Sequence, residues 1–147
     1  MLSMTSTAPH STEERNWAVA AHLSALVAVV GIPFGHIVGP LAVYLIRRDV
    51  SAFDTAHARA ALNFQITVSI AGLAAIVVAA FCWFFLVVVV SQSRDGSLIP
   101  VVAFAWFAVL AGAIAASIWT IVQVVRGAIA ASHDRPFRYP VAIDFVR

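Results

Sequence analysis

The sequence predicts an all-α fold: a polytopic integral membrane protein with four helical segments, a broken N-terminal helical hairpin plus two full transmembrane helices. Of the 147 residues, 62% are hydrophobic and only 11% are charged, against about 45–50% and about 25% in soluble domains. Residues 16–46, 60–93 and 96–125 contain no Asp, Glu, Lys or Arg, and each stretch exceeds the ~20 residues that cross a bilayer. Pro33, flanked by glycines, interrupts the first stretch, which favours a hairpin there.

The chain begins with a polar segment, residues 1–12, that is rich in Ser and Thr. It lacks the basic start and apolar core of a signal peptide, and we expect it to be disordered. Glu14 follows Ser11 by three positions, the spacing of a capping box ahead of an apolar run. A helix should therefore begin near Glu13.

The first charge-free stretch is too long for one straight crossing. A continuous helix over 17–46 would measure about 45 Å at ~1.5 Å per residue, whereas the hydrocarbon core is only ~30 Å thick. The break at Pro33 predicts two half-length helices, about 13–30 and 36–47. A re-entrant hairpin and two short spans both fit this pattern, and a single kinked helix is a further alternative.

Three glycines stand four residues apart around this break: Gly31, Gly35 and Gly39. The prolines Pro33 and Pro40 forbid one uninterrupted helix across them. We therefore expect these glycines to allow tight turning and close contact with another helix.

Two plain transmembrane helices follow, at about 55–91 and 99–133, and complete a helical membrane domain over 13–133. The polar turn between them is short, so they should form an antiparallel hairpin. Residues 134–147 mix Arg with Phe, Tyr and Ile. This mixture favours a cytoplasmic tail at the membrane interface, with Arg135 and Arg138 beside anionic headgroups; a loosely ordered end is the alternative.

The distribution of arginine predicts the orientation, because cytoplasmic loops carry an excess of basic residues. If the first stretch is a hairpin, every arginine except Arg94 lies on one side of the membrane. We expect a multi-pass protein of the bacterial inner membrane with the 47–59 loop and the C-terminus in the cytoplasm. The position of the N-terminus depends on the hairpin, which places it in the cytoplasm too.

Small residues recur every four positions on both transmembrane helices: Ala71, Ala75 and Ala79, then Ala108, Gly112 and Ala116. Small residues let helix backbones approach closely in lipid. The two stripes are predicted to face each other within one chain, and a homodimer seam is the alternative.

Ten residues are candidates for a polar cluster or a structural role: His22, Pro33, Pro40, His57, Arg59, Asn63, Gln65, Gln123, Tyr139 and Pro140. Asn63 and Gln65 are costly at the membrane entrance unless paired, and Gln123 is placed to meet Asn63. One interpretation is a polar site or path lined by four of them: His22, His57, Asn63 and Gln123. The other is interhelical hydrogen bonding that fixes the bundle, worth about 0.6–2 kcal/mol per contact.

Groups that would carry catalysis are scarce. No acidic residue lies inside a span. The histidines show no metal-ligand spacing, and the sequence has no Gly-rich phosphate loop. The sequence therefore predicts no enzyme, no catalytic residue, no cofactor and no metal site, and it identifies no small-molecule substrate. A net charge of +2 does not indicate nucleic-acid binding.

Five sequence elements carry a family resemblance: Trp17 to Leu26 with His22, Gly39-Pro40-Leu41, Arg47-Arg48-Asp49 with Ser51 to Phe53, His57 to Gln65, and Arg138-Tyr139-Pro140. Together they resemble a widespread bacterial family of small membrane proteins of unknown function. That family is similar to the twenty-kilodalton Tic subunit of the chloroplast inner-envelope translocon. The resemblance covers about residues 13–145 and implies a four-segment helical membrane fold. This chain departs from the family pattern at Ala60, where an acidic residue is common, and at Asp134, near a common Gly.

The leading functional hypothesis is a small integral membrane protein without enzymatic activity. Its partners would be the lipid bilayer and either further copies of itself or other membrane proteins. The alternative is a translocation or permeation component whose broken hairpin and polar cluster line a path, by analogy with the plastid relative.

Overall fold

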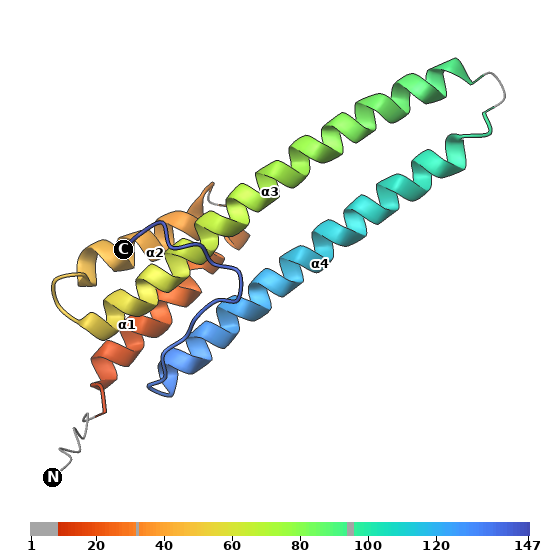
Figure 1. The fold of residues 1–147 in the computed structure, drawn as a ribbon. Coiled ribbons are helices and arrows are strands. Elements are labelled where there is room, and N and C mark those ends of the chain that lie inside the picture. The colour runs from red at the N-terminus through yellow and green to blue at the C-terminus, as the bar shows by residue number, and fades with distance from the viewer. Residues whose placement is uncertain (1–8, 32, 94–95) are drawn as a thin grey trace, which may run out of the picture. The chain divides into compact units, whose positions relative to one another are not determined.

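The structure is a computed structural model that describes residues 9–31, 33–93 and 96–147 (Figure 1). Its elements are α1 (Thr12–Leu23), the 3-10 segment η1 (Ser24–Val30), α2 (Gly35–Arg47), α3 (Ala52–Gln92) and α4 (Ile99–Ser132). The described residues contain no strand, and α3 and α4 are long and apolar enough to cross a membrane. The predicted all-α membrane fold is confirmed.

The chain divides into two compact units. The first, called the terminal unit, contains the residues up to Thr67 together with residues 122–147. The second, called the apolar hairpin, contains residues 68–121 from α3 and α4. The 41 residues of α3 span about 61 Å at ~1.5 Å per residue, twice the thickness of the hydrocarbon core. Only part of α3 can therefore lie in hydrocarbon. That part is the stretch from Val68 onward, in which no polar side chain is buried.

The start of α1 has the predicted capping box. The Ser11 hydroxyl accepts a hydrogen bond from the Glu14 N–H at 3.2 Å, and the Glu14 carboxylate accepts one from the Ser11 N–H at 2.9 Å. These bonds lower the pKa of the Glu14 carboxyl. Residues 1–8 of the predicted polar tail lie outside the described residues, while His10 and Ser11 make defined contacts.

The break in the first charge-free stretch reverses the chain. Gly31 and Phe34 both have positive φ, 87° and 56°, and α2 turns back beside α1 (Figure 1). A Cβ added to Gly39 would lie 2.4 Å from the Ser24 carbonyl oxygen, and one added to Gly35 would lie 3.0 Å from the Ala28 nitrogen. The predicted role of the glycines in turning and close contact is confirmed, and a single kinked helix is excluded.

The first half of this hairpin is not one regular helix, although a helix over about 13–30 was expected. The α-helical geometry of α1 ends at Leu23, and the chain tightens into η1 as far as Val30. Beyond the hairpin, α3 begins at Ala52, three residues before the predicted 55, because Ser51 accepts the N–H of Asp54 and extends the helix start.

Small side chains allow the terminal unit to pack tightly. Ala21 of α1, Val43 of α2 and Ala58 of α3 form a buried apolar cluster, with Trp17 and Tyr44 packed against it. Three helices can approach closely here because two of the three central residues are alanines. This cluster fixes the helix faces that carry the polar residues discussed below.

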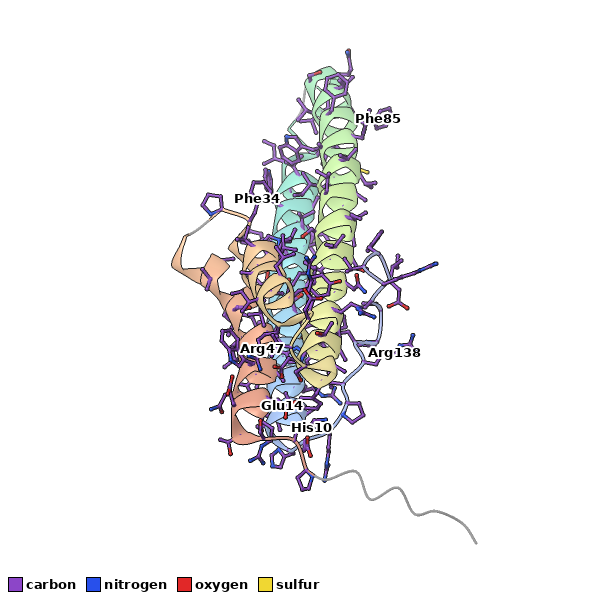
Figure 2. All side chains as sticks on the ribbon, turned by 90° about the vertical axis from the view of Figure 1, so that its left-hand side faces the viewer. His10, Glu14, Phe34, Arg47, Phe85 and Arg138 are labelled. Carbon is purple, nitrogen blue, oxygen red and sulfur yellow. The ribbon has the colours of Figure 1, made fainter. Side chains whose placement is uncertain are left out.

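The apolar hairpin exposes its apolar side chains. No residue in the most apolar 18-residue stretch of α3 or of α4 is buried, and Figure 2 shows Phe85 pointing away from α3. Trp83 and Trp106 contact each other with ring centroids 4.7 Å apart. A Cβ added to Gly112 would meet no described atom within 4 Å, so the structure has no close backbone approach there. Contact between the two small-residue stripes remains a prediction.

Candidate functional site

The centre of the terminal unit is a hydrogen-bonded row of two histidines and a tyrosine. His22, near the end of α1, contacts His57 Nδ1 through its Nε2 at 2.9 Å. Its Nδ1 lies 2.8 Å from the hydroxyl of Tyr139 in the C-terminal tail. His22 fits because α4 has no side chain at Gly127, where an added Cβ would lie 2.7 Å from His22 Nδ1.

Both ring nitrogens of His22 are used, which gives the row a direction. A neutral imidazole has one donor and one acceptor nitrogen. If Tyr139 donates a hydrogen bond to His22, then His22 donates to His57; if Tyr139 accepts from His22, then His22 accepts from His57. Burial, with a smaller contribution from His57, lowers the pKa of His22 to about 3, and burial raises the pKa of Tyr139. Burial also lowers the pKa of His57, to about 4, so the row is uncharged near neutral pH.

The row ends at His57. The Nε2 atom of His57 is buried and has no hydrogen-bond partner among the residues that the structure describes. Phe53 covers His57 with an edge contact at 4.6 Å. At the other end, Phe64 stacks on Tyr139 at 4.0 Å and Phe137 meets the same ring edge-on at 4.9 Å. The aromatic rings thus separate the row from water.

A second polar group lies where α1, α2 and α3 meet. The Arg47 Nε donates to Asp54 at 2.7 Å and its guanidinium also contacts Glu13 at 3.2 Å, while Trp17 lies 5.1 Å from the guanidinium carbon. The bond to Asp54 raises the pKa of Arg47. Arg47 and Glu14 are labelled in Figure 2 on this part of the molecule. Sequence reasoning missed this group, although Arg47 and Asp54 stand at the two ends of one short loop.

Asn63 binds the C-terminal tail. Its side-chain oxygen accepts the N–H groups of Phe145 and Val146 at 3.2 and 2.8 Å, and its nitrogen donates to the Val146 carbonyl at 3.1 Å. One turn further along α3, the Thr67 hydroxyl accepts the N–H of Ile143 at 2.9 Å. The expected partner of Asn63 was Gln123; the backbone of the tail satisfies the carboxamide instead.

The remaining sequence candidates are spread over the terminal unit. Gln65 and Gln123 are buried, and Arg59 has a buried Nε without a partner among the described residues. Pro40 is buried inside α2. Pro33 is exposed at the turn, and Pro140 is exposed beside Tyr139. The structure thus joins His22, His57 and Tyr139 directly and places Asn63 in a separate contact with the tail.

The chemistry available here is limited. Among the described residues, no group of three or more His, Cys, Asp or Glu side chains could hold a metal ion. The row is neutral and walled by aromatic rings, so it offers hydrogen-bond fixation or a directional proton path rather than a nucleophile or an oxyanion site.

Comparison with known proteins gives one family. No curated protein and no solved structure matches the chain. A family model, described as the magnetosome magnetite crystal formation protein family MamF/MmsF, matches residues 13–146. This range nearly coincides with the one that carried the resemblance to a bacterial family of small membrane proteins. The predicted similarity to the Tic subunit is not supported. The chain belongs to the MamF/MmsF family, whose members are involved in magnetosome magnetite crystal formation.

Proposed function

We propose that this chain is a non-enzymatic integral membrane protein that acts by assembling with itself or with other membrane proteins. Membership of the family supports a membrane-associated role in magnetite crystal formation. The proposed setting is a bacterial membrane, with the 47–59 loop and both termini on the cytoplasmic side as the arginine distribution predicts.

The proposal rests on the terminal unit, in which polar side chains are buried while large apolar side chains are exposed. Polar side chains such as His22, Asp54 and Asn63 are buried and bonded within the unit. Large apolar side chains of the α1–α2 hairpin face outward, including Phe34 at 71% exposure and Val38 at 54%. An exposed apolar surface of this kind marks contact with lipid or with another protein.

The proposal is tested by photocrosslinking in the native membrane. A photoreactive residue at Val38 on the exposed face of α2 should yield a covalent dimer or an adduct with another membrane protein. The matched control is the same residue at Val50, which is also exposed but lies in the short loop between α2 and α3. Adducts at neither position, with the protein recovered only as a monomer, would contradict assembly.

The family role is tested separately. The chain is expressed in a magnetosome-forming bacterium from which its own family members have been deleted. Restored crystal size and number in electron micrographs would support participation in crystal formation. Crystals unchanged from the deletion strain, with the protein present in the membrane, would contradict it.

A second candidate function, permeation, is favoured by one observation: the directional row Tyr139–His22–His57 ends at a buried nitrogen with no partner among the described residues. Reconstituted vesicles should then show a proton or ion flux that His57→Ala abolishes. Flux no greater than in empty vesicles removes this candidate.

A further inference from the structure

A pocket with a basic lining lies at the C-terminal end of α4. Its volume is about 370 Å³, and it is lined by Arg126, Ile129, Ala130, His133, Arg135 and Phe137. Two arginines and a histidine therefore line the same pocket as an isoleucine and a phenylalanine. This combination suits a ligand that carries both an anionic group and an apolar part.

The basic side chains are not needed to complete the helix end. The N–H of Arg135 donates to the Ala130 carbonyl at 2.9 Å and that of Asp134 donates to Ala131 at 3.1 Å, the two bonds of a Schellman motif. Asp134 occupies the left-handed position of this motif, with φ 60°. The His133 ring adds a bond to the Ile129 carbonyl at 2.8 Å. The last carbonyls of α4 are thus satisfied without either guanidinium.

The neighbouring carboxylate is also already bonded. One oxygen of Asp134 accepts the backbone N–H of His10 at 3.1 Å, and the other contacts the His10 ring. These bonds lower the pKa of the Asp134 carboxyl. Among the described residues, the side chains of Arg126 and Arg135 have no hydrogen bond and no ion pair. Both guanidinium groups are therefore available to an external anion.

The level of the pocket along α4 indicates where that anion comes from. Arg126 is the first charged residue after the charge-free stretch 96–125. A bilayer excludes charge from its hydrocarbon core, and the headgroup layer begins where that core ends. Arg126 is therefore the first position after this stretch at which a charged side chain of α4 can meet phospholipid phosphates.

We infer that this pocket binds the phosphate group of an anionic phospholipid, held by Arg126 and Arg135. A guanidinium presents paired donors that match phosphate oxygens, and Ile129 and Phe137 supply apolar contact beside the phosphate. The same phosphate chemistry occurs in soluble phosphate esters; the lipid is favoured because Arg126 directly follows the charge-free stretch 96–125. This site is independent of the proposed assembly.

Native mass spectrometry of the full chain in detergent with equal phosphatidylglycerol and phosphatidylcholine tests this inference. The unaltered chain should retain phosphatidylglycerol preferentially, and the double variant R126Q/R135Q should lose that retention by about tenfold. Arg126→Lys with Arg135→Lys, which keeps the charge, should lose less. The matched control is Arg48→Gln, an exposed arginine paired only with its neighbour Asp49.

Two outcomes would overturn the inference. One is equal lipid retention by R126Q/R135Q and by the Arg48→Gln control, when circular dichroism shows all variants to be folded. The other is saturable binding of inorganic phosphate, followed by phosphorus NMR, without any preference for phosphatidylglycerol; this would assign the pocket to a soluble phosphate ester.

Discussion

His22 Nε2 lies 2.9 Å from His57 Nδ1, and this contact joins α1 to α3 across 35 positions of the chain. Tyr139 extends it into the C-terminal tail. Because both imidazoles are buried, the terminal unit depends on their neutral form and on the space that surrounds His22.

Gly127→Ala should destabilise the protein by about 1–3 kcal/mol, because the added methyl group would collide with the buried ring of His22. Gly112→Ala is the matched control, since it also lies inside α4 but its Cβ meets no described atom within 4 Å. The control should be neutral or slightly stabilising, in line with helix propensity. Unfolding in mixed detergent micelles measures both, and equal stability of the two variants would show that His22 is not packed against Gly127.

Tyr139→Phe should cost about 1–3 kcal/mol, because it leaves His22 Nδ1 buried without its partner while keeping the ring stacked on Phe64. Tyr44→Phe serves as the control, since Tyr44 is only partly buried against the apolar cluster. The same unfolding measurement applies. A loss no larger for Tyr139→Phe than for Tyr44→Phe would mean that the hydroxyl does not bond His22.

The low pKa of His22 predicts a loss of stability in mild acid. The unfolded chain takes up a proton at His22 as the pH falls below about 6.5, while the folded chain resists it down to about 3. Stability from this group is complete above pH 6.5 and declines as the pH falls through this window, by at most about 1.4 kcal/mol per pH unit. Burial also lowers the pKa of His57, to about 4, and raises the pKa of the Asp54 carboxyl, so His22 accounts for only part of the acid dependence. His22→Gln should reduce the slope of the unfolding profile between pH 5 and 6.5, and an unchanged slope would contradict the assignment.

Asp134→Asn should release the N-terminal segment without unfolding the membrane helices. Asn tolerates the left-handed conformation at this position, so the end of α4 is kept, but the ionised partner of His10 is lost. Limited proteolysis should then cut near His10 faster than in the unaltered chain, with the same thermal midpoint. Unchanged cleavage would indicate that residues 9–11 are held mainly by the stacking of His10 on Phe53.

Local signals made much of the fold predictable. The capping box of Ser11 and Glu14 and the turn around Pro33 depend on neighbouring residues only. The glycine spacing predicted close contact with another helix, and the structure shows that α2 makes this contact with η1. Charge-free stretches located α3 and α4 because lipid excludes charge. The change from α1 to η1 was not predictable, since nothing in its apolar sequence separates α-helical from 3-10 geometry.

The residues of the site were predictable, but the contacts between them were not. His22, His57 and Tyr139 were candidates for a polar cluster or a structural role, but the bond between His22 and Tyr139 spans 117 positions. Helix periodicity predicts which face a residue lies on and not which residue it contacts. Asn63 illustrates the same limit. Its carboxamide was expected to bond Gln123, but the backbone of the tail supplies its partners instead. The ion pair of Arg47 with Asp54 was missed because Arg47 was considered only for membrane orientation and as part of a family motif.

Counting subunits in the native membrane decides whether the protein works by assembly. Native membranes are dispersed into nanodiscs without detergent, and the fluorescently tagged full chain is analysed by single-molecule photobleaching together with mass spectrometry of co-purified proteins. We expect two or more copies in a disc, or one copy with a reproducible membrane-protein partner. A single copy with no partner in discs prepared from the native membrane would contradict assembly.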